Sequence, residues 1–344
     1  MKRLITLLCL TIVMTNCSWA KQEKEYKLYG IAFYNLENLF DTKHDEGKND
    51  YEFLPDGGYH WTEQKYQAKL KNMATVISQL CDKIPAGAAI VGLAECENIG
   101  VLEDLVKQEP IARRGYKPVL IEGPDRRGID CGLLYNPRFF TLESTKLVPY
   151  RDPSNPGFKT RGFLVVGGKL DGEKLHVIVC HWPSRASEDR CRVVAAEGVK
   201  AVKDSLLRAF PNSKIFIMGD MNDDPKNNSM VRGLGCKHKL KGLKDNDLYN
   251  PWWDMLYKVG QGTLLYQGEW NLFDQIVFTG NMVNGSGKHL TYYKSEIFLR
   301  PWLMQEEGKY KGSPKRTHAG GTWLNGYSDH FPTQVYLIKE KERK

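Results

Sequence analysis

The sequence predicts an α/β fold, because short apolar runs typical of buried strands alternate with segments of helical periodicity. A second observation concerns the ends of these strands. Most are followed at once by a polar residue capable of chemistry, namely Asn35, Glu95, His181, Asp220 and Asn222. Open α/β sheets bind ligands beyond the carboxyl ends of their strands. We therefore expect the functional site at one edge of a sheet.

Each expected element rests on its hydrophobic period. Residues 63–81 carry apolar side chains at steps of four and three, which is one face of a helix, and a second helix is expected over 187–210. The apolar runs 163–170 and 175–180 flank Asp171-Gly172, which is a strong hairpin signal. Further strands are expected over 29–34, 88–94, 130–135, 214–218, 272–278 and 333–338.

The first twenty residues are expected to be a signal peptide. A basic start precedes an apolar run, residues 4–14, that is too short to span a bilayer, and small residues favour cleavage after Ala20. The alternative is a lipoprotein signal with Cys17 as the acylated residue, although the asparagine before it suits that reading poorly. We therefore predict an exported protein, periplasmic or extracellular, in which residues 21–344 form one domain.

Composition is compatible with one large domain. The chain has 344 residues, 41% of them hydrophobic, and no linker rich in Pro, Ser or Gly divides it. A formal net charge of +8 suits phosphate-bearing partners, but many exported proteins are mildly basic without such a role. The sequence contains no C-x-x-C pair, so a zinc cluster is not expected, and Cys131 and Cys180 are expected to be buried free thiols. No later stretch predicts a transmembrane helix, and we expect a monomer.

The segments that follow the strands contain the groups that phosphoester hydrolysis needs. Such a reaction requires a hard cation held by oxygen ligands, an oriented water, and donors for the charge on the phosphoryl oxygens. The segments are FYNLEN at 33–38, AECEN at 94–98, RGIDCGLLY at 127–135, CHWPS at 180–184, MGDMND at 218–223, FDQI at 273–276 and YSDHFP at 327–332. In their order along the chain, they resemble the motifs of the endonuclease/exonuclease/phosphatase superfamily.

The resemblance covers nearly the whole chain after residue 20 and implies both a fold and a metal. The implied fold is that of deoxyribonuclease I, a four-layer α/β sandwich in which two mixed β-sheets pack face to face with helices outside. The implied cofactor is Mg²⁺ or Mn²⁺. Glu95 would be its main ligand, with Asn35 and Asp329 assisting directly or through water.

The resemblance also assigns the catalytic residues. Asp220 would align or deprotonate the attacking water, and Asn222 would orient the phosphate. His330 would stabilise the phosphate or act as a base, with Asp274 orienting its ring. His181 would stabilise the transition state or protonate the leaving oxygen.

Three further residues are predicted less directly. Carboxylate partners are expected for both catalytic imidazoles, because they would keep an imidazolium near neutral pH, and Asp130 is the candidate partner for His181. Arg185 could grip a substrate phosphate or have no such role. Tyr135 could contact phosphate or be a packed aromatic at a strand end.

The motifs leave three functions open. The favoured one is an exported nuclease that cuts the phosphodiesters of DNA or RNA, and the alternative is a phosphatase or phosphodiesterase acting on small or lipid phosphoesters such as inositol phosphates or sphingomyelin. A catalytically inactive binding scaffold is the third. Substrate choice is expected to depend on the loops 42–60, 150–160, 237–262 and 280–326, where no family motif is found.

Overall fold

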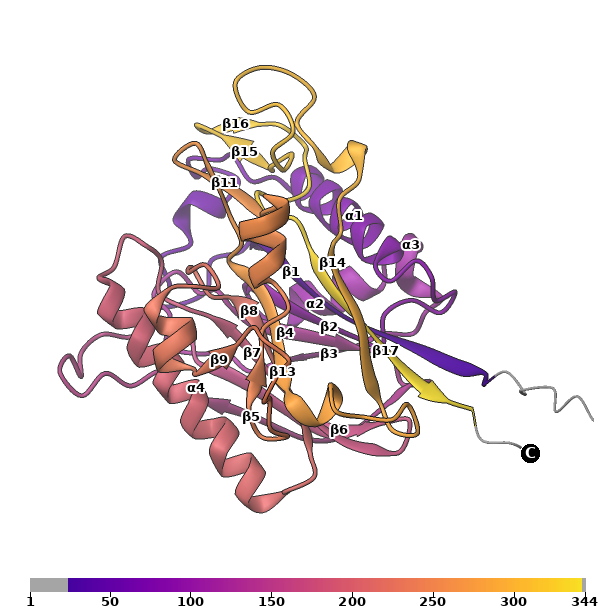
Figure 1. The fold of residues 1–344 in the computed structure, drawn as a ribbon. Coiled ribbons are helices and arrows are strands. Elements are labelled where there is room, and N and C mark those ends of the chain that lie inside the picture. Colours follow the sequence, from indigo (N-terminus) through magenta and orange to yellow (C-terminus); the bar gives the residue numbers. More distant parts are fainter. Residues whose placement is uncertain (1–23, 342–344) are drawn as a thin grey trace, which may run out of the picture.

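The computed structural model describes residues 24–341, so the predicted signal peptide and Cys17 lie outside the described residues. Two large β-sheets form its centre (Figure 1). The first has six strands, in the spatial order β14 (Thr291–Ile297), β17 (Thr333–Glu340), β1 (Tyr26–Leu39), β2 (Ile90–Cys96), β4 (Asp130–Tyr135) and β3 (Lys117–Leu120). The second has seven, in the order β5 (Phe140–Val148), β6 (Phe163–Leu170), β7 (Glu173–His181), β8 (Lys214–Asp220), β13 (Asp274–Thr279), β10 (Leu248–Tyr249) and β9 (Cys236–Lys237).

Both sheets are mixed. Strand β1 is parallel to β2, and β7 is parallel to β8, whereas most other neighbours are antiparallel. The hairpin between β6 and β7 turns at Asp171 and Gly172, which have φ of 46° and 82°. Positive φ at both central residues is the geometry that an Asp-Gly pair allows, so the predicted hairpin is confirmed.

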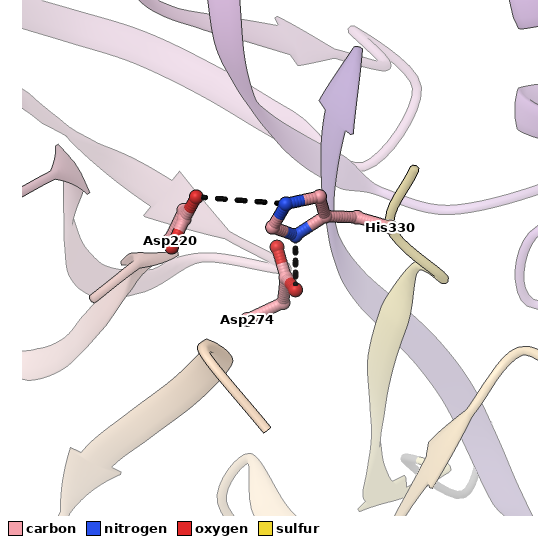
Figure 2. A group of neighbouring side chains, drawn as sticks. All are labelled: Asp220, Asp274 and His330. Atoms are coloured by element: carbon pink, nitrogen blue, oxygen red, sulfur yellow. Dashed lines mark hydrogen bonds and ion pairs between the residues drawn. The ribbon is translucent and has the colours of Figure 1, made fainter. Parts of the chain in front are cut away.

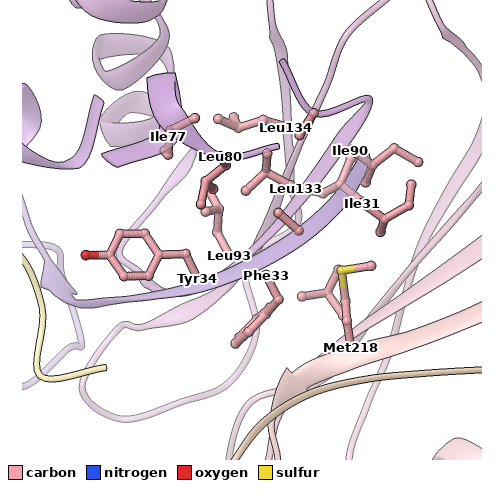
Figure 3. Packing of buried hydrophobic residues seen from close by; sticks show 14 of the residues in the cluster. Ile31, Phe33, Tyr34, Ile77, Leu80, Ile90, Leu93, Leu133, Leu134 and Met218 are labelled. Atoms are coloured by element: carbon pink, nitrogen blue, oxygen red, sulfur yellow. The ribbon is translucent and has the colours of Figure 1, made fainter. Parts of the chain in front are cut away.

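The two sheets pack face to face through apolar side chains. Phe33 of β1 and Ile90 of β2 belong to the same buried cluster as Met218 of β8 (Figure 3). The sheets are in close contact where Gly92 faces Met218, since a Cβ atom added at Gly92 would lie 2.4 Å from the Met218 sulfur. A larger residue than glycine at position 92 would therefore push the sheets apart.

Helices cover the outer faces of the sheets (Figure 1). Helix α1 (Glu63–Gln79) buries its predicted apolar face in the main core, next to the short helices α2 (Ile99–Val106) and α3 (Glu109–Ala112). Helix α4 (Asp189–Ala209) packs on the second sheet through a separate cluster that includes Val199 and Ile217. The predicted four-layer sandwich is confirmed.

Some elements were not predicted. Strands β5 and β14 lie at sheet edges and have mixed, partly exposed patterns, so their hydrophobic period is weak. Two small hairpins, β11–β12 (Leu264–Tyr266, Glu269–Asn271) and β15–β16 (His318–Ala319, Thr322–Trp323), lie in loops where no element was expected. All six cysteines of the described residues are buried and free, as expected for Cys131 and Cys180. No described helix is long and apolar enough to cross a membrane.

Candidate active site

The sheet topology brings four of the predicted residues to one edge. Asn35 and Glu95 lie near the ends of the parallel strands β1 and β2, and His181 and Asp220 end the parallel strands β7 and β8. In the second sheet, Asp220 has His181 as its register partner on one side and Asp274 on the other. Three predicted catalytic residues therefore form a row across neighbouring strands.

Asn35 connects the two sheets at this edge. Its Nδ2 atom donates to Oδ2 of Asp220 at 3.1 Å and to Oε1 of Glu95 at 3.4 Å. Asn35 is fully buried, and its carbonyl oxygen accepts a hydrogen bond from the hydroxyl of Ser328. A single buried asparagine thus contacts a proposed metal ligand and a proposed base through its side chain, and the terminal S-D-H motif through its backbone carbonyl.

His330 forms a buried pair with Asp274. Its Nδ1 atom lies 2.7 Å from Oδ2 of Asp274, and its Nε2 atom is 3.9 Å from Oδ2 of Asp220 (Figure 2). Burial by itself would lower the pKa of His330, but Asp274, Asp329 and Asp220 outweigh that effect and raise the pKa well above its usual value. The raised pKa favours the imidazolium form, and Nε2 is directed toward Asp220.

His181 differs from the prediction. Its Nε2 atom lies 3.7 Å from Oδ2 of Asp220 and 3.8 Å from Oε1 of Glu95, whereas its buried Nδ1 atom has no hydrogen-bond partner among residues 24–341. Burial first, and then the guanidinium groups of Arg161 and Arg127, lower the pKa of His181 well below its ordinary value. The lowered pKa favours a neutral ring, in contrast to the imidazolium expected at this position.

Asp130 is not the partner of His181. Its Oδ2 atom accepts a hydrogen bond from the backbone N–H of Gly123 at 2.9 Å, and no hydrogen bond or ion pair joins it to the imidazole. Burial raises the pKa of Asp130 to about 7. Asp130 begins β4 opposite Cys96, so it is near the correct edge of the sheet, but its carboxylate is directed to the loop that precedes its own strand.

Asp220 has the environment of a base that works near neutral pH. Burial raises its pKa to about 7, and the carboxylates of Asp274 and Glu95 add to the rise, while His330 opposes it. Its two oxygens accept hydrogen bonds from the Nδ2 of Asn35 and the backbone N–H of Asn222. The carboxylate is thus fixed in orientation and able to take up a proton at physiological pH.

The residues fit a divalent cation. Glu95 and Asp329 both line a cavity of about 350 Å³. Their carboxylate oxygens are donors that Mg²⁺ and Mn²⁺ prefer. Asn35 does not present its amide oxygen, because Oδ1 accepts the backbone N–H of Glu37 at 2.9 Å and Nδ2 faces Glu95 and Asp220, so its direct contact with a metal stays a prediction. A second arrangement of donors is available, since Asp220, Asp274 and His330 offer atoms within 4.8 Å of one another. The short bond between His330 and Asp274 already engages two of these donors, so we favour the set around Glu95 as metal ligands.

Backbone strain is concentrated at the same edge. Glu37, Asn38, Glu95 and Asn222 all have positive φ, between 50° and 62°, although none is glycine. Such conformations cost on the order of 1–3 kcal/mol each and persist where the surrounding structure imposes them, most often at functional sites. The bulge in β1 between Asn35 and Leu39 contains two of them. The strand therefore bends where it reaches the site.

Asn222 and Arg185 lie beside this edge and contact each other. The side chain of Asn222 donates to the carbonyl oxygen of Trp182 at 3.1 Å. Arg185 donates to the carbonyl oxygen of Asn222 and to Asp224, both at 3.1 Å, and its guanidinium lies 4.2 Å from the ring centre of Phe273. Both residues support the loop after β8, and their contact with phosphate stays a prediction.

Tyr135 lies at the wrong end of its strand for the predicted contact. It pairs with Ile90, the first residue of β2, whereas Glu95 comes five residues later. At about 3.3 Å per residue, the separation along the strand is on the order of 16 Å. Because β4 is antiparallel to β2, Asp130 lies at the site edge of the sheet. Tyr135 lies at the opposite edge, where its ring packs against Phe140.

Sequence reasoning missed the wall of the cavity. Besides Glu95 and Asp329, the cavity is lined by three segments distant in sequence, which contribute Phe53, Tyr59 and Trp61, then Arg127, then Arg316 and His318. Most of these residues fall in the segments 42–60 and 280–326, where we expected substrate choice to lie, whereas Trp61 and Arg127 lie outside them. No period or motif in the sequence indicated which individual residues would line the cavity, because the lining arises from the packing of loops.

Comparison with known proteins agrees with this geometry. A family model described as Endonuclease/Exonuclease/phosphatase family matches residues 30–339. Mannosyl-6-phosphatase from Bacteroides thetaiotaomicron VPI-5482 is 17% identical with a TM-score of 0.56, over 90% of this chain and 99% of that one. ANGEL2, described as a 2',3'-cyclic phosphatase, is 14% identical with a TM-score of 0.60, over 94% and 100%. TDP2 of D. rerio, solved with a single-strand DNA product, is 14% identical with a TM-score of 0.54, over 90% and 98%. No curated protein sequence matches the chain.

At these identities the solved structures establish the fold alone. The family model, in contrast, extends over nearly the whole chain and includes every predicted catalytic and metal-binding residue from Asn35 to His330. With its acids, amide and two imidazoles gathered at one sheet edge, the chain belongs to the endonuclease/exonuclease/phosphatase family and is a metal-dependent phosphoric ester hydrolase.

Proposed function

We propose that this chain hydrolyses a small, soluble phosphoester and that the leaving group occupies the cavity beside Glu95. The observation that carries the proposal is the cavity itself, which has a volume of about 350 Å³ and lies directly against Glu95 and Asp329. Hairpin β15–β16 contributes His318 to its wall and is drawn over one end of the sheets (Figure 1). A bounded cavity of this size suits a compact group such as a sugar better than a polymer.

The lining also favours a polar leaving group. Two guanidinium groups, of Arg127 and Arg316, reach the cavity, and the half-buried Tyr59 lines it. Arginine side chains donate to anionic or hydroxyl oxygens, and aromatic faces pack against sugar rings. The similarity in fold to a mannosyl-6-phosphatase and a 2',3'-cyclic phosphatase supports the same substrate class.

The nuclease activity favoured by the sequence is the second candidate. A formal net charge of +8 and the fold similarity to a TDP2 bound to a single-strand DNA product support it. The two activities would share one set of catalytic residues, so only the shape of the surroundings separates them. We place the small phosphoester first because loop segments wall the cavity and limit the size of the group that it can hold.

In either case the residues would act in the same way. A bound Mg²⁺ or Mn²⁺, held by Glu95 and Asp329 while Asn35 orients the Glu95 carboxylate, would neutralise charge on the phosphate. Asp220, with a pKa of about 7, would accept a proton from the attacking water. The imidazolium of His330 would donate from Nε2 to a phosphoryl oxygen. His181, as a neutral ring, would donate one hydrogen bond and could not act as a strong acid.

A substrate panel tests the proposal. Hexose phosphates, p-nitrophenyl phosphate, a 2',3'-cyclic nucleotide, single-stranded DNA and plasmid DNA are assayed in Mg²⁺ or Mn²⁺, with and without EDTA, and with an Asp220→Asn control. We expect turnover of small phosphoesters that EDTA and the substitution both abolish. Cleavage of DNA without turnover of any small phosphoester would overturn the proposal in favour of the nuclease, and activity that survives EDTA would overturn the metal assignment.

We further propose that the chain is exported and works as a monomer. The apolar run at 4–14 and the small residues before position 21 support export. Mass spectrometry of the protein from its native cells would show cleavage after Ala20, or a lipid on Cys17 if the alternative holds. Light scattering of the purified protein would test the monomer.

A further inference from the structure

A lysine side chain that no motif assigns is fully buried beneath the cavity. Lys69 lies on α1 and has 0% of its surface exposed. Its ammonium donates to the hydroxyl of Thr317 and, at 2.7 Å, to the carbonyl oxygen of Tyr327. A buried ammonium is costly unless it is paired and hydrogen-bonded, so a lysine in this place calls for a structural reason.

Its counter-charge is Glu37, in the strained bulge of β1. This carboxylate is also buried, and its Oε2 atom accepts the backbone N–H of Thr317 at 2.6 Å. Its Oε1 atom accepts the Nε–H of Arg316 at 3.4 Å. Thr317 is therefore held from two sides, by Lys69 through its hydroxyl and by Glu37 through its amide.

Lys69 and Glu37 both bind the segment 315–330, which contributes to the site in two ways. Arg316, Thr317 and His318 line the cavity, and the same segment ends in the S-D-H motif. The two functions are joined by Arg316, whose terminal nitrogen donates to Oδ2 of Asp329 at 2.8 Å. Displacement of Arg316 and Thr317 would thus move the cavity wall and release a predicted metal ligand at once.

Helix α1 is anchored to this segment at two successive turns. Three residues after Lys69, Asn72 donates to the carbonyl oxygens of Asn325 and Gly326, at 3.2 and 2.9 Å. The contacts at Asn72 are to the exposed end of the loop, whereas those at Lys69 are to its buried base. From this buried base, the chain leads on one side to the residues that line the cavity and on the other side to Asp329.

We propose that Lys69 is a positioning residue that sets the orientation of Asp329 and of the cavity wall through Thr317, Glu37 and Arg316. It touches neither substrate nor metal. Its effect on metal binding depends on the metal requirement of the family and on Asp329 as a metal ligand. Its effect on KM rests on the cavity being the substrate site proposed above. The two effects are measured separately.

The test uses two substitutions and two matched controls in the full-length chain. Lys69→Met removes the charge and keeps the length, and Lys71→Met makes the same change at an exposed position of α1. Because Lys69→Met leaves the buried Thr317 hydroxyl and Tyr327 carbonyl without their donor, it can fail to fold. Thr317→Val removes only the hydroxyl that Lys69 binds, and Thr317→Ser retains that hydroxyl.

Mn²⁺ affinity is measured by electron paramagnetic resonance without substrate, and kcat and KM are measured on p-nitrophenyl phosphate at saturating Mn²⁺. For Thr317→Val, and for Lys69→Met if it folds, we expect affinity for Mn²⁺ to fall about tenfold or more, as for other groups that orient metal ligands. Thr317→Ser and Lys71→Met should keep the wild-type affinity. If Thr317→Val folds and binds Mn²⁺ as the wild type does, the proposal is wrong. A normal KM with weakened Mn²⁺ binding would keep the metal role and reject the cavity as substrate site.

Discussion

The Nδ1 atom of His330 lies 2.7 Å from Oδ2 of Asp274, although the two residues are 56 positions apart in the chain. Strand β13 provides the carboxylate, and the loop before β17 provides the imidazole. The bond holds the ring in one orientation, with Nε2 toward Asp220, and keeps it protonated. Five predictions follow from this and related contacts.

Asp274→Asn should lower kcat by about 10²-fold or more, with a smaller change in KM. The amide keeps the size of the side chain but cannot stabilise an imidazolium, so the pKa of His330 should fall. The measurement is the pH dependence of kcat. The limb that reports loss of the His330 proton should move to lower pH in the variant. An unchanged profile with wild-type kcat would contradict the proposed role of the pair.

His181→Gln should lower kcat, whereas Asp130→Asn should have a much weaker effect. The structure separates these residues, since Asp130 bonds to Gly123 and His181 faces Asp220 and Glu95. Loss of one donor to the transition state costs on the order of 10²-fold. Steady-state kinetics on both variants would check this. Equal, large losses in both would restore the pairing that the sequence predicted.

Arg127→Gln should raise KM for a small phosphoester about tenfold or more and leave kcat within a few-fold of wild type. Arg127 lines the cavity, and the one described hydrogen bond of its guanidinium is to Oδ1 of Asn38 at 3.4 Å, so its charge is available to a substrate. A charge-assisted hydrogen bond contributes about 1.5–3 kcal/mol. Arg138→Gln, at an exposed position at the start of the β4–β5 connection, serves as the control. A normal KM in Arg127→Gln would remove this residue from substrate binding.

The contribution of His176 to stability should fall as the solution is acidified from pH 6.5 toward pH 4. Burial lowers the pKa of His176 from 6.5 to about 4, so the folded state resists a proton that the unfolded chain accepts. This stabilisation is complete above pH 6.5 and is lost as the pH drops, by at most about 1.4 kcal/mol per pH unit for one group. Urea unfolding of wild type and His176→Gln at several pH values measures it. The free energy of unfolding of the wild type, relative to that of the variant, should decrease as the pH drops, and a difference that does not change with pH would show that His176 does not contribute. The comparison cancels the other titrating groups, among them His318, whose pKa burial also lowers to about 4, and Asp130 and Asp220, whose raised pKa values act in the opposite direction.

Gly92→Ala should destabilise the fold by about 1–3 kcal/mol, because the new methyl group would overlap the Met218 sulfur between the two sheets. Gly157→Ala is the matched control, since nothing lies within 4 Å of a Cβ added there. Urea unfolding of both variants decides the matter. If the two substitutions cost the same, the sheets are not in close contact at Gly92.

Much of the fold could be predicted from periodicity. The helix at α1, the hairpin at Asp171-Gly172 and the central strands all have strong local patterns, and the structure contains each of them. Strands β5 and β14 lie at edges, where one side of the strand meets solvent, so their patterns were too weak to recognise.

The candidate site was predicted as a set of residues and not as a set of contacts. Order along the chain and position after strands identified Asn35, Glu95, His181 and Asp220, which parallel pairing then brings to one edge. The same reasoning could not tell that Tyr135 lies at the far edge, because this depends on β4 running antiparallel to β2.

The sequence by itself determined which residue types are present, which of them follow strands, and the family whose motifs they resemble, because these are local properties of the chain. The tertiary structure alone decided the lowered pKa of His181, the pairing of Asp130 with Gly123, and the buried support that Lys69 and Glu37 give to the cavity wall. The pKa and hydrogen bonds of a buried group depend on what packing removes from water around it, and the groups concerned come from distant parts of the chain.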